Sequence, residues 1–193
     1  IYIGALCSPL FIRFFFKTSR NIESKLKERI FGFFLDSRLP VPDIIVLETD
    51  SLKLSNAMIS GFQGTSALGR PTLFITRSLL NELNEAELKA VLLHEISHVT
   101  LNHLKTRLLA QWASIAVAFC LGIFFTFTVF FLTNDSWMRL GTASMAALAV
   151  ALSPVIVVRK MIEAQELEAD TVAVFRMGAD LDSLCSALTK LDE

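Results

Sequence analysis

The stretch Val91-Leu-Leu-His-Glu-Ile-Ser-His-Val99 places two histidines four residues apart, with a glutamate directly after the first. Residues i and i+4 of a helix lie on one face, so the imidazoles of His94 and His98 can bind one metal ion. This is the HExxH zinc arrangement, in which Glu95 is the general base for a metal-bound water. Because the chain has only three histidines, the pattern seldom arises by chance, and a helix with two surface histidines is the weaker interpretation.

The sequence before the motif predicts a helix that begins at a defined residue and covers a small sheet. Asn84 is a candidate N-cap, and Glu87, three residues later, completes a capping-box pattern. Apolar residues then recur at helical spacing, so the helix should be half buried while its histidines face a cleft. Three short apolar segments upstream predict the strands of an antiparallel or mixed sheet, at 43–48, 57–61 and 71–76.

A catalytic zinc normally has three protein ligands, so the motif needs one more. His103 comes one residue too early for the HExxHxxGxxH spacing, and no glycine between Val99 and Asn102 turns the chain back. On a continuing helix it would lie about 180° from His94. We therefore expect His103 to be a surface or membrane-edge residue rather than a ligand.

The acidic segment 162–170 supplies a better third ligand. Glu166 and Asp170 share a helix face, so Glu166 can bind zinc while Asp170 accepts the free ring N–H of a ligating histidine. Glu168 points roughly 160° to 200° away from this pair, and Glu163, one turn earlier, remains an alternative ligand. An acidic helix end that is simply solvated is the competing interpretation.

Two long uncharged runs predict membrane spans. No charged residue occurs from Leu108 to Asn134 or from Leu140 to Val158, and each run is long enough to cross a hydrocarbon core. Residues 1–16 are apolar apart from one arginine and precede a basic cluster, so they predict the last part of a further span. A helical hairpin buried in a soluble protein is the alternative, but the rest of the chain is too short to cover it.

A parity argument predicts the orientation of these spans. His98 and Glu166 must meet at one zinc, so the chain between them must cross the membrane an even number of times. Basic residues flank the uncharged runs on the zinc side, at Lys105, Arg107, Arg159 and Lys160 among others. By the positive-inside rule, the active site should face the cytoplasm.

Charge and cysteine content exclude other classes of partner and site. With 18 basic and 19 acidic residues, the chain has no excess of positive charge for nucleic acid. Cys7, Cys120 and Cys185 have no metal-ligand spacing, and two of them lie in apolar stretches, so we expect no disulfide framework. The chain begins at Ile1 inside an apolar run, so we expect it to be cut from a longer protein.

Several segments together resemble the HtpX-type membrane zinc metalloproteases, gluzincins that are related to the type I CAAX prenyl proteases. The resemblance covers Asn56 to Gly61, Ile75 to Leu80, Glu87 to His98 with its HEISH motif, and the E-x-x-A-D pattern from Glu166 to Asp170. Two hydrophobic spans between the second histidine and the glutamate are also typical of HtpX-like proteins. Where the family often has arginines before this glutamate, the chain has Glu163 and Gln165.

The resemblance implies His94, His98 and Glu166 as ligands of one zinc per chain, Glu95 as the catalytic base and Asp170 as an orienting residue. It also makes 56–61 and 71–76 candidate substrate-contact segments, since an edge strand can pair with an extended peptide. The implied activity is hydrolysis of peptide bonds in membrane or misfolded proteins. The alternatives are a CAAX prenyl protease of the endoplasmic reticulum and a non-catalytic, zinc-containing membrane sensor.

The predicted fold is α+β, mostly helical, in a multi-pass integral membrane protein. A zincin-like metalloprotease domain combines the HExxH helix with a small β-sheet, and a transmembrane helical hairpin is inserted between the zinc-ligand helices. The expected parts are a partial transmembrane helix (1–16), the first part of a cytoplasmic protease domain (17–107), the hairpin (108–158) and a second, incomplete part of the domain (159–193). The expected surroundings are the lipid bilayer of a bacterial inner membrane and polypeptide substrates, whereas the oligomeric state is not predicted.

Overall fold

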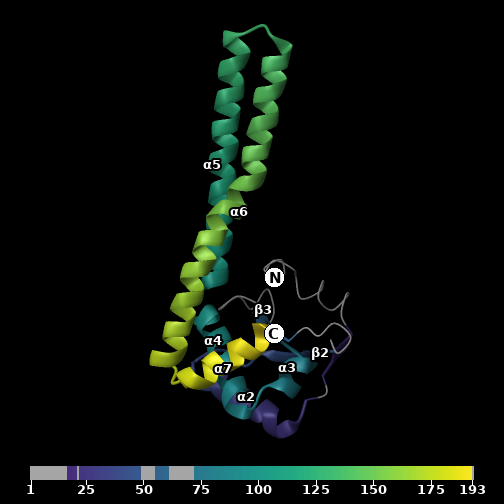
Figure 1. Ribbon diagram of the computed structural model, residues 1–193, viewed down its shortest axis with the longest axis vertical. Coiled ribbons are helices and arrows are strands. Elements are labelled where there is room, and N and C mark those ends of the chain that lie inside the picture. Colours follow the sequence, from purple (N-terminus) through teal and green to yellow (C-terminus); the bar gives the residue numbers. More distant parts are fainter. Residues whose placement is uncertain (1–16, 21, 49–54, 61–71, 193) are drawn as a thin grey trace. The chain divides into compact units, whose positions relative to one another are not determined.

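The computed structural model describes residues 17–20, 22–48, 55–60 and 72–192, and these form a mostly helical chain with a small mixed sheet (Figure 1). This confirms the expected balance of secondary structure, while the predicted span at 1–16 lies outside the described residues. The elements in chain order are β1 (Thr18–Ser19), α2 (Ser24–Asp36), β2 (Asp43–Leu47), β3 (Ala57–Ser60), β4 (Thr72–Thr76), α3 (Arg77–Glu82), α4 (Glu85–Thr100), α5 (His103–Leu132), α6 (Ser136–Phe175) and α7 (Leu181–Asp192).

The chain divides into two compact units. The first unit, called here the sheet unit, contains the described residues up to Leu104 together with the segment from Leu167 onward. The second, the hairpin unit, contains Lys105 to Glu166, so the two boundaries between the units fall inside α5 and inside α6.

The sheet has the strand order β1-β2-β4-β3. Strands β2 and β4 are parallel, with Ile44 opposite Leu73, whereas β1 pairs with β2 and β3 pairs with β4 in antiparallel fashion. The three strands expected from the sequence are therefore present, in a mixed sheet. The two-residue strand β1 was not predicted, because two residues carry no alternation pattern.

The main core lies where one face of the sheet packs against helices α2, α4 and α7. Its buried side chains include Ile30 and Phe34 of α2, Ile44, Leu73 and Ile75 of the sheet, Leu88, Leu92 and Ile96 of α4, and Leu184 and Ala187 of α7. The helix with the two histidines thus covers the sheet, as expected. Helix α2 begins at Ser24, after Thr18 and Ser19 have paired with β2. Helix α7 was not predicted.

The first turn of α4 is fixed by a complete capping box. The Asn84 Oδ1 accepts from the backbone N–H groups of Ala86 and Glu87 at 2.9 and 3.0 Å, and the Asn84 N–H donates to Glu87 Oε2 at 2.9 Å. The other oxygen of Glu87 accepts from Ser186 Oγ at 2.7 Å and from Lys190 Nζ at 2.8 Å. Glu87 therefore ties α7 to the beginning of α4 as well as capping that helix.

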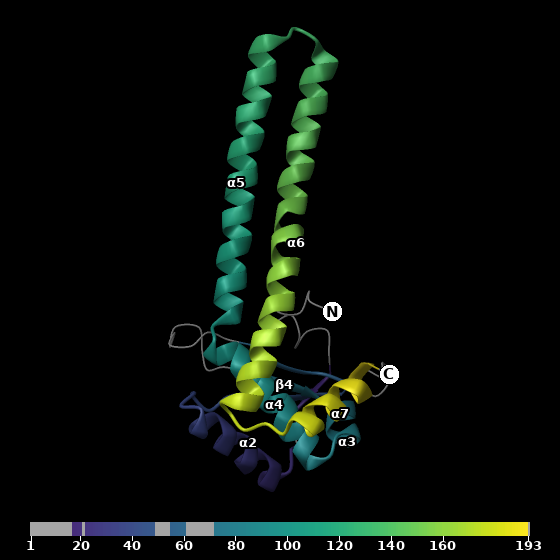
Figure 2. The ribbon, with the colours of Figure 1, turned by 60° about the vertical axis from the view of Figure 1, so that its left-hand side comes forward.

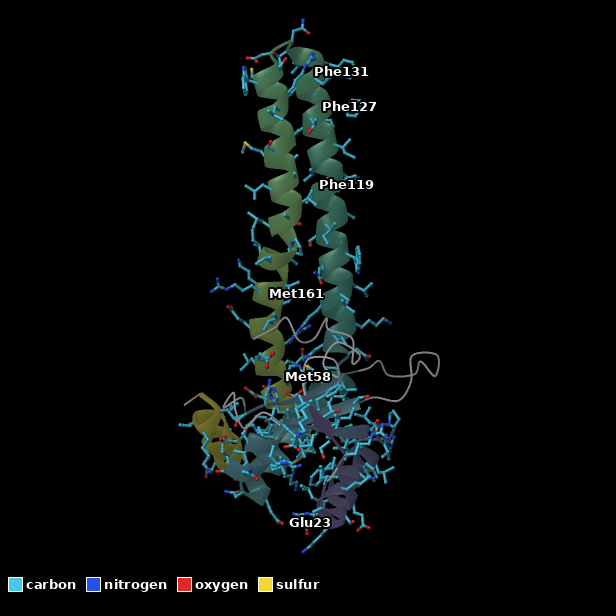
Figure 3. The ribbon with its side chains drawn as sticks, turned by 90° about the vertical axis from the view of Figure 1, so that its right-hand side faces the viewer. Glu23, Met58, Phe119, Phe127, Phe131 and Met161 are labelled. Carbon is cyan, nitrogen blue, oxygen red and sulfur yellow. The ribbon has the colours of Figure 1, made fainter. Side chains whose placement is uncertain are left out.

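In the hairpin unit, α5 and α6 lie side by side (Figures 1 and 2). The Ser153 hydroxyl donates to the Ser114 carbonyl at 3.3 Å, and a Cβ added at Gly122 would lie 3.0 Å from the Ala146 Cβ. Small residues thus allow the two helices to approach closely. The large apolar side chains are exposed instead, and Figure 3 shows Phe119, Phe127 and Phe131 projecting outward from α5. Both helices are long and apolar enough to cross a membrane.

The connection between α5 and α6 is short, because α5 ends at Leu132 and Ser136 already begins α6. The Asp135 Oδ1 accepts from the Trp137 N–H at 2.8 Å, which caps the new helix. Arg139 donates to the carbonyl oxygens of Phe130 and Thr133 at the end of α5, both at 2.9 Å. These bonds satisfy backbone groups at both helix ends, where the helices themselves leave them unpaired.

The acid stability of the sheet unit should depend on Glu87. Lys190, then Ser186 and the Asn84 N–H, lower the pKa of Glu87 from 4.5 to about 2. Because the folded-state pKa is depressed, ionised Glu87 stabilises the fold above the unfolded-state pKa, and this contribution is lost as the pH falls from about 4.5 towards 2. At pH 7, Glu87→Gln should therefore lower the thermal unfolding midpoint, and the difference from wild type should shrink at pH 3.

Exposed Glu28 on α2 provides the matched control, and Glu28→Gln should leave the unfolding midpoint nearly unchanged at both pH values. If the unfolding midpoints of Glu87→Gln and wild type differed by the same amount at pH 7 and pH 3, the ionised carboxylate would not be the stabilising group.

Candidate metal centre

Helix α4 presents His94 and His98 from one face because the opposite face is fixed in the core. Leu92 and Ile96 are completely buried against the sheet, which sets the rotation of the helix about its axis. The His94 and His98 rings are partly buried and meet edge to face, with their Nε2 atoms 3.1 Å apart. Glu95 follows His94 and precedes His98 by three residues, so it lies beside the same face, partly buried.

The separation of these two Nε2 atoms suits a shared metal ion. Two nitrogens bound to a tetrahedral zinc at 2.0–2.1 Å lie about 3.3–3.4 Å apart, close to the 3.1 Å of this pair. Imidazole nitrogens are also ligands that zinc prefers. The geometry and the chemistry of the two histidines therefore fit a zinc ion.

Asp170, from the part of α6 that belongs to the sheet unit, holds the other side of the His94 ring. Its Oδ1 lies 2.8 Å from His94 Nδ1. A carboxylate at this distance favours the tautomer with the proton on Nδ1, which leaves the lone pair of Nε2 for a metal. The structure thus places Asp170 beside His94 in the geometry that an orienting residue needs.

Glu166 precedes Asp170 by four residues on α6, so the two side chains leave the same face of the helix. Within the hairpin unit, Arg107 Nη2 donates to Glu166 Oε1 at 3.1 Å, and Arg107 Nε donates to Gln165 Oε1. Glu166 and Arg107 therefore form an ion pair within the hairpin unit.

The side chain of Glu163, the alternative ligand, is 72% exposed. Its Oε1 lies 3.8 Å from the Nε of Arg159, one turn earlier on the same helix. Its side chain therefore has the features of a solvated surface residue. No described contact links Glu163 to the histidines.

The expectation that His103 is exposed was wrong. Helix α4 ends at Thr100, and the chain turns at Asn102, which has a φ of 56°. Asparagine adopts this left-handed conformation more readily than most residues, so no glycine is needed. The turn brings His103, the first residue of α5, back against His98, with their Nδ1 atoms 2.7 Å apart. His103 is 3% exposed and is neither a surface nor a membrane-edge residue.

Glu168 was assigned no role from the sequence, because it points away from Glu166 and Asp170. In the structure its Oε2 lies 3.2 Å from the Nε2 of His103. The asparagine immediately before His103 was the one sequence signal for this contact, since it allows the helix to break there. The contact itself depends on two segments more than 60 residues apart, which no local pattern predicts.

This chain is similar to known proteases. Residues 17–191 match the model of peptidase family M48. A protease HtpX homolog from Acidiphilium cryptum (strain JF-5) is 30% identical over 159 residues, which is 80% of this chain and 51% of that protein. A CAAX prenyl protease 1 homolog from Dictyostelium discoideum is 33% identical over 104 residues, which is 53% of this chain and 24% of that protein.

The fold also resembles the crystal structure of S. mikatae Ste24p, with a TM-score of 0.58 and 23% sequence identity over 95% of this chain and 46% of that one. The chain thus spans about half the length, or less, of the proteins that it matches. The family match covers all the elements that carry the histidines and the acidic segment, and it confirms the resemblance noted from the sequence. The chain belongs to peptidase family M48.

Proposed function

We propose that this chain is the catalytic part of a membrane-bound zinc metalloendopeptidase that hydrolyses peptide bonds of membrane or misfolded proteins. The observation that carries the proposal is the approach of His94 Nε2 to His98 Nε2, at 3.1 Å, with a carboxylate behind the first ring. Membership of a peptidase family supports the same activity. The two similar proteins, an HtpX homolog and a CAAX prenyl protease 1 homolog, are both called proteases.

One zinc per chain would be held by His94, His98 and Glu166, which offer two imidazole nitrogens and a carboxylate oxygen. The Arg107 guanidinium hydrogen-bonds one oxygen of Glu166 and would limit the rotation of that carboxylate. Asp170 would keep the proton on Nδ1 of His94, so that Nε2 stays a ligand. When bound, zinc supplies a Lewis acid that acidifies water and polarises a peptide carbonyl.

Glu95 is the proposed general base. Because it lies next to His94 on α4, its carboxylate can take a proton from a water at the site and later deliver that proton to the leaving amine. A purely structural zinc site has no need of such a base, so Glu95 favours turnover over a non-catalytic sensor.

The sheet offers a surface for an extended peptide. Strand β3 is one of the two edge strands of the described sheet, and it packs against α4, which carries the histidines. An added strand can hydrogen-bond to such an edge through its main chain, independently of its sequence. We propose that β3 holds the substrate backbone near the metal centre.

The hairpin unit supports a membrane location. Large apolar side chains cover α5 and α6 and are exposed, including Phe124, Phe127 and Phe131 on α5 and Leu148, Val155 and Ile156 on α6. In water such a surface would favour aggregation, whereas in a lipid bilayer it is solvated by acyl chains. We propose a multi-pass protein of a bacterial inner membrane whose active site faces the cytoplasm.

A prenyl-protein protease of the endoplasmic reticulum is the second candidate, because the Dictyostelium discoideum protein is called a CAAX prenyl protease 1 homolog. The match to the HtpX homolog extends over 80% of this chain rather than 53%, which favours the first candidate.

The substitution Glu95→Gln tests the chemistry. It should leave bound zinc near the wild-type amount, since Glu95 is not a ligand, and should slow cleavage of an unfolded protein by about 100-fold or more, because the base is lost. The measurements are zinc content and proteolysis rate for the purified chain. As a control, Glu163→Gln removes an exposed carboxylate of α6 and should change neither. Undiminished cleavage by Glu95→Gln would rule out the base assigned here.

The topology is tested by thiol labelling of intact cells in a background where the three native cysteines are replaced. An impermeant reagent should modify a cysteine introduced at Ser136, near the connection of the hairpin, and should not modify one at Ser55 in the sheet unit. This follows from two crossings between His98 and Glu166 and from the basic residues on the side of the zinc. The reverse labelling would place the site outside the cytoplasm, and protection of both positions would contradict a membrane-crossing hairpin.

A further inference from the structure

His103 is the most deeply buried histidine of the chain, and its surroundings link it to the metal centre. Its Nδ1 lies 2.7 Å from His98 Nδ1, and the two ring centroids are 4.9 Å apart. On its other side, its Nε2 lies 3.2 Å from the Oε2 of Glu168. These contacts form a continuous hydrogen-bond network from His98 through His103 to Glu168. All three residues belong to the sheet unit.

The direction of the hydrogen bonds follows from the chemistry of imidazole. Two ring nitrogens 2.7 Å apart share one proton, so one ring donates and the other accepts. If His98 uses Nε2 for the metal, its proton must be on Nδ1, and His103 Nδ1 must then be the acceptor. The proton of a neutral His103 is therefore on Nε2, where it is donated to Glu168. One assignment of protons thus satisfies both the contact of His98 with His103 and the contact of His103 with Glu168.

A carboxylate would then orient each of the two histidines of the motif. His94 reaches a carboxylate directly, at Asp170, whereas His98 reaches one through the ring of His103. Asp170 and Glu168 are two residues apart on α6, so they leave the helix on different sides and serve different histidines. A carboxylate behind a metal-bound imidazole fixes the orientation of the ring and makes it a better ligand.

We propose that His103 and Glu168 are positioning residues that hold His98 in the tautomer and orientation that zinc needs. This inference rests on the proposed zinc site of His94, His98 and Glu166, and it adds two residues to that site. The turn at Asn102 is needed for this contact, because a continuous helix would place His103 on the side of α4 opposite to His94.

The test compares zinc affinities, measured by competition with a chromophoric chelator on the purified full chain. His103→Leu removes the acceptor for His98 and should weaken zinc binding by about 10- to 100-fold. His103→Asn places an amide oxygen near the position of the lost Nδ1 and should recover most of the affinity. Asp170→Ala provides a comparison for the direct contact, and Glu163→Ala provides a control that removes an exposed carboxylate of α6.

A second measurement distinguishes a changed ligand geometry at the metal site from a loss of folding. With cobalt(II) in place of zinc, the visible absorption bands report the ligand field, and they should shift in His103→Leu but not in Glu163→Ala. Glu168→Ala changes a side chain that is 56% exposed, so the fold should be retained while zinc affinity falls in the same direction by a smaller factor.

The inference would be overturned by wild-type zinc affinity and an unshifted cobalt spectrum in folded His103→Leu. If that variant does not fold, unchanged values for Glu168→Ala overturn the inference instead. Failure of the proposed function looks different, since the wild-type chain itself would then bind no zinc. Binding of zinc by wild type with no effect of His103→Leu would leave the zinc site intact and remove only His103 and Glu168 from it.

Discussion

The structure depends on the geometry that makes two imidazoles of one helix converge on one point. His94 and His98 are separated by one helical turn, their Nε2 atoms lie 3.1 Å apart, and a second side chain holds each ring from behind. Asp170 holds the first ring at 2.8 Å, and His103 holds the second at 2.7 Å. Two lone pairs so close together repel each other unless a proton or a cation lies between them, which favours metal binding at this point.

The rest of the sheet unit holds α4 in the position from which His94 and His98 converge. Leu92 and Ile96 bury one side of the helix against the sheet, and Glu87 fixes its beginning through Asn84 and through the side chains of Ser186 and Lys190. The end of α4 is fixed by the turn at Asn102, which returns the chain to His98. The helix that carries the motif is thus held at both ends and along one side.

Local patterns in the sequence were enough to predict the capping box at Asn84, the three longer strands and the helix across the sheet, because each depends on neighbouring residues or on periodicity. Helix periodicity was also enough to put Asp170 and Glu166 on one face of α6. The sequence did not predict the burial of His103, because helix periodicity alone does not show that α4 ends before Asn102. Nor did it predict the contact of Glu168 with His103, which joins α6 to α5 and depends on the tertiary fold.

The most direct test of the central claim is the zinc content of the purified chain, measured per polypeptide for wild type, Glu166→Ala and Glu163→Ala. Two histidines alone leave a zinc one protein ligand short of a catalytic site, so the third ligand decides whether the metal is retained. The account predicts one zinc in wild type and in Glu163→Ala, and loss of zinc in Glu166→Ala. Full retention of zinc by Glu166→Ala would contradict it, as would loss in Glu163→Ala alone.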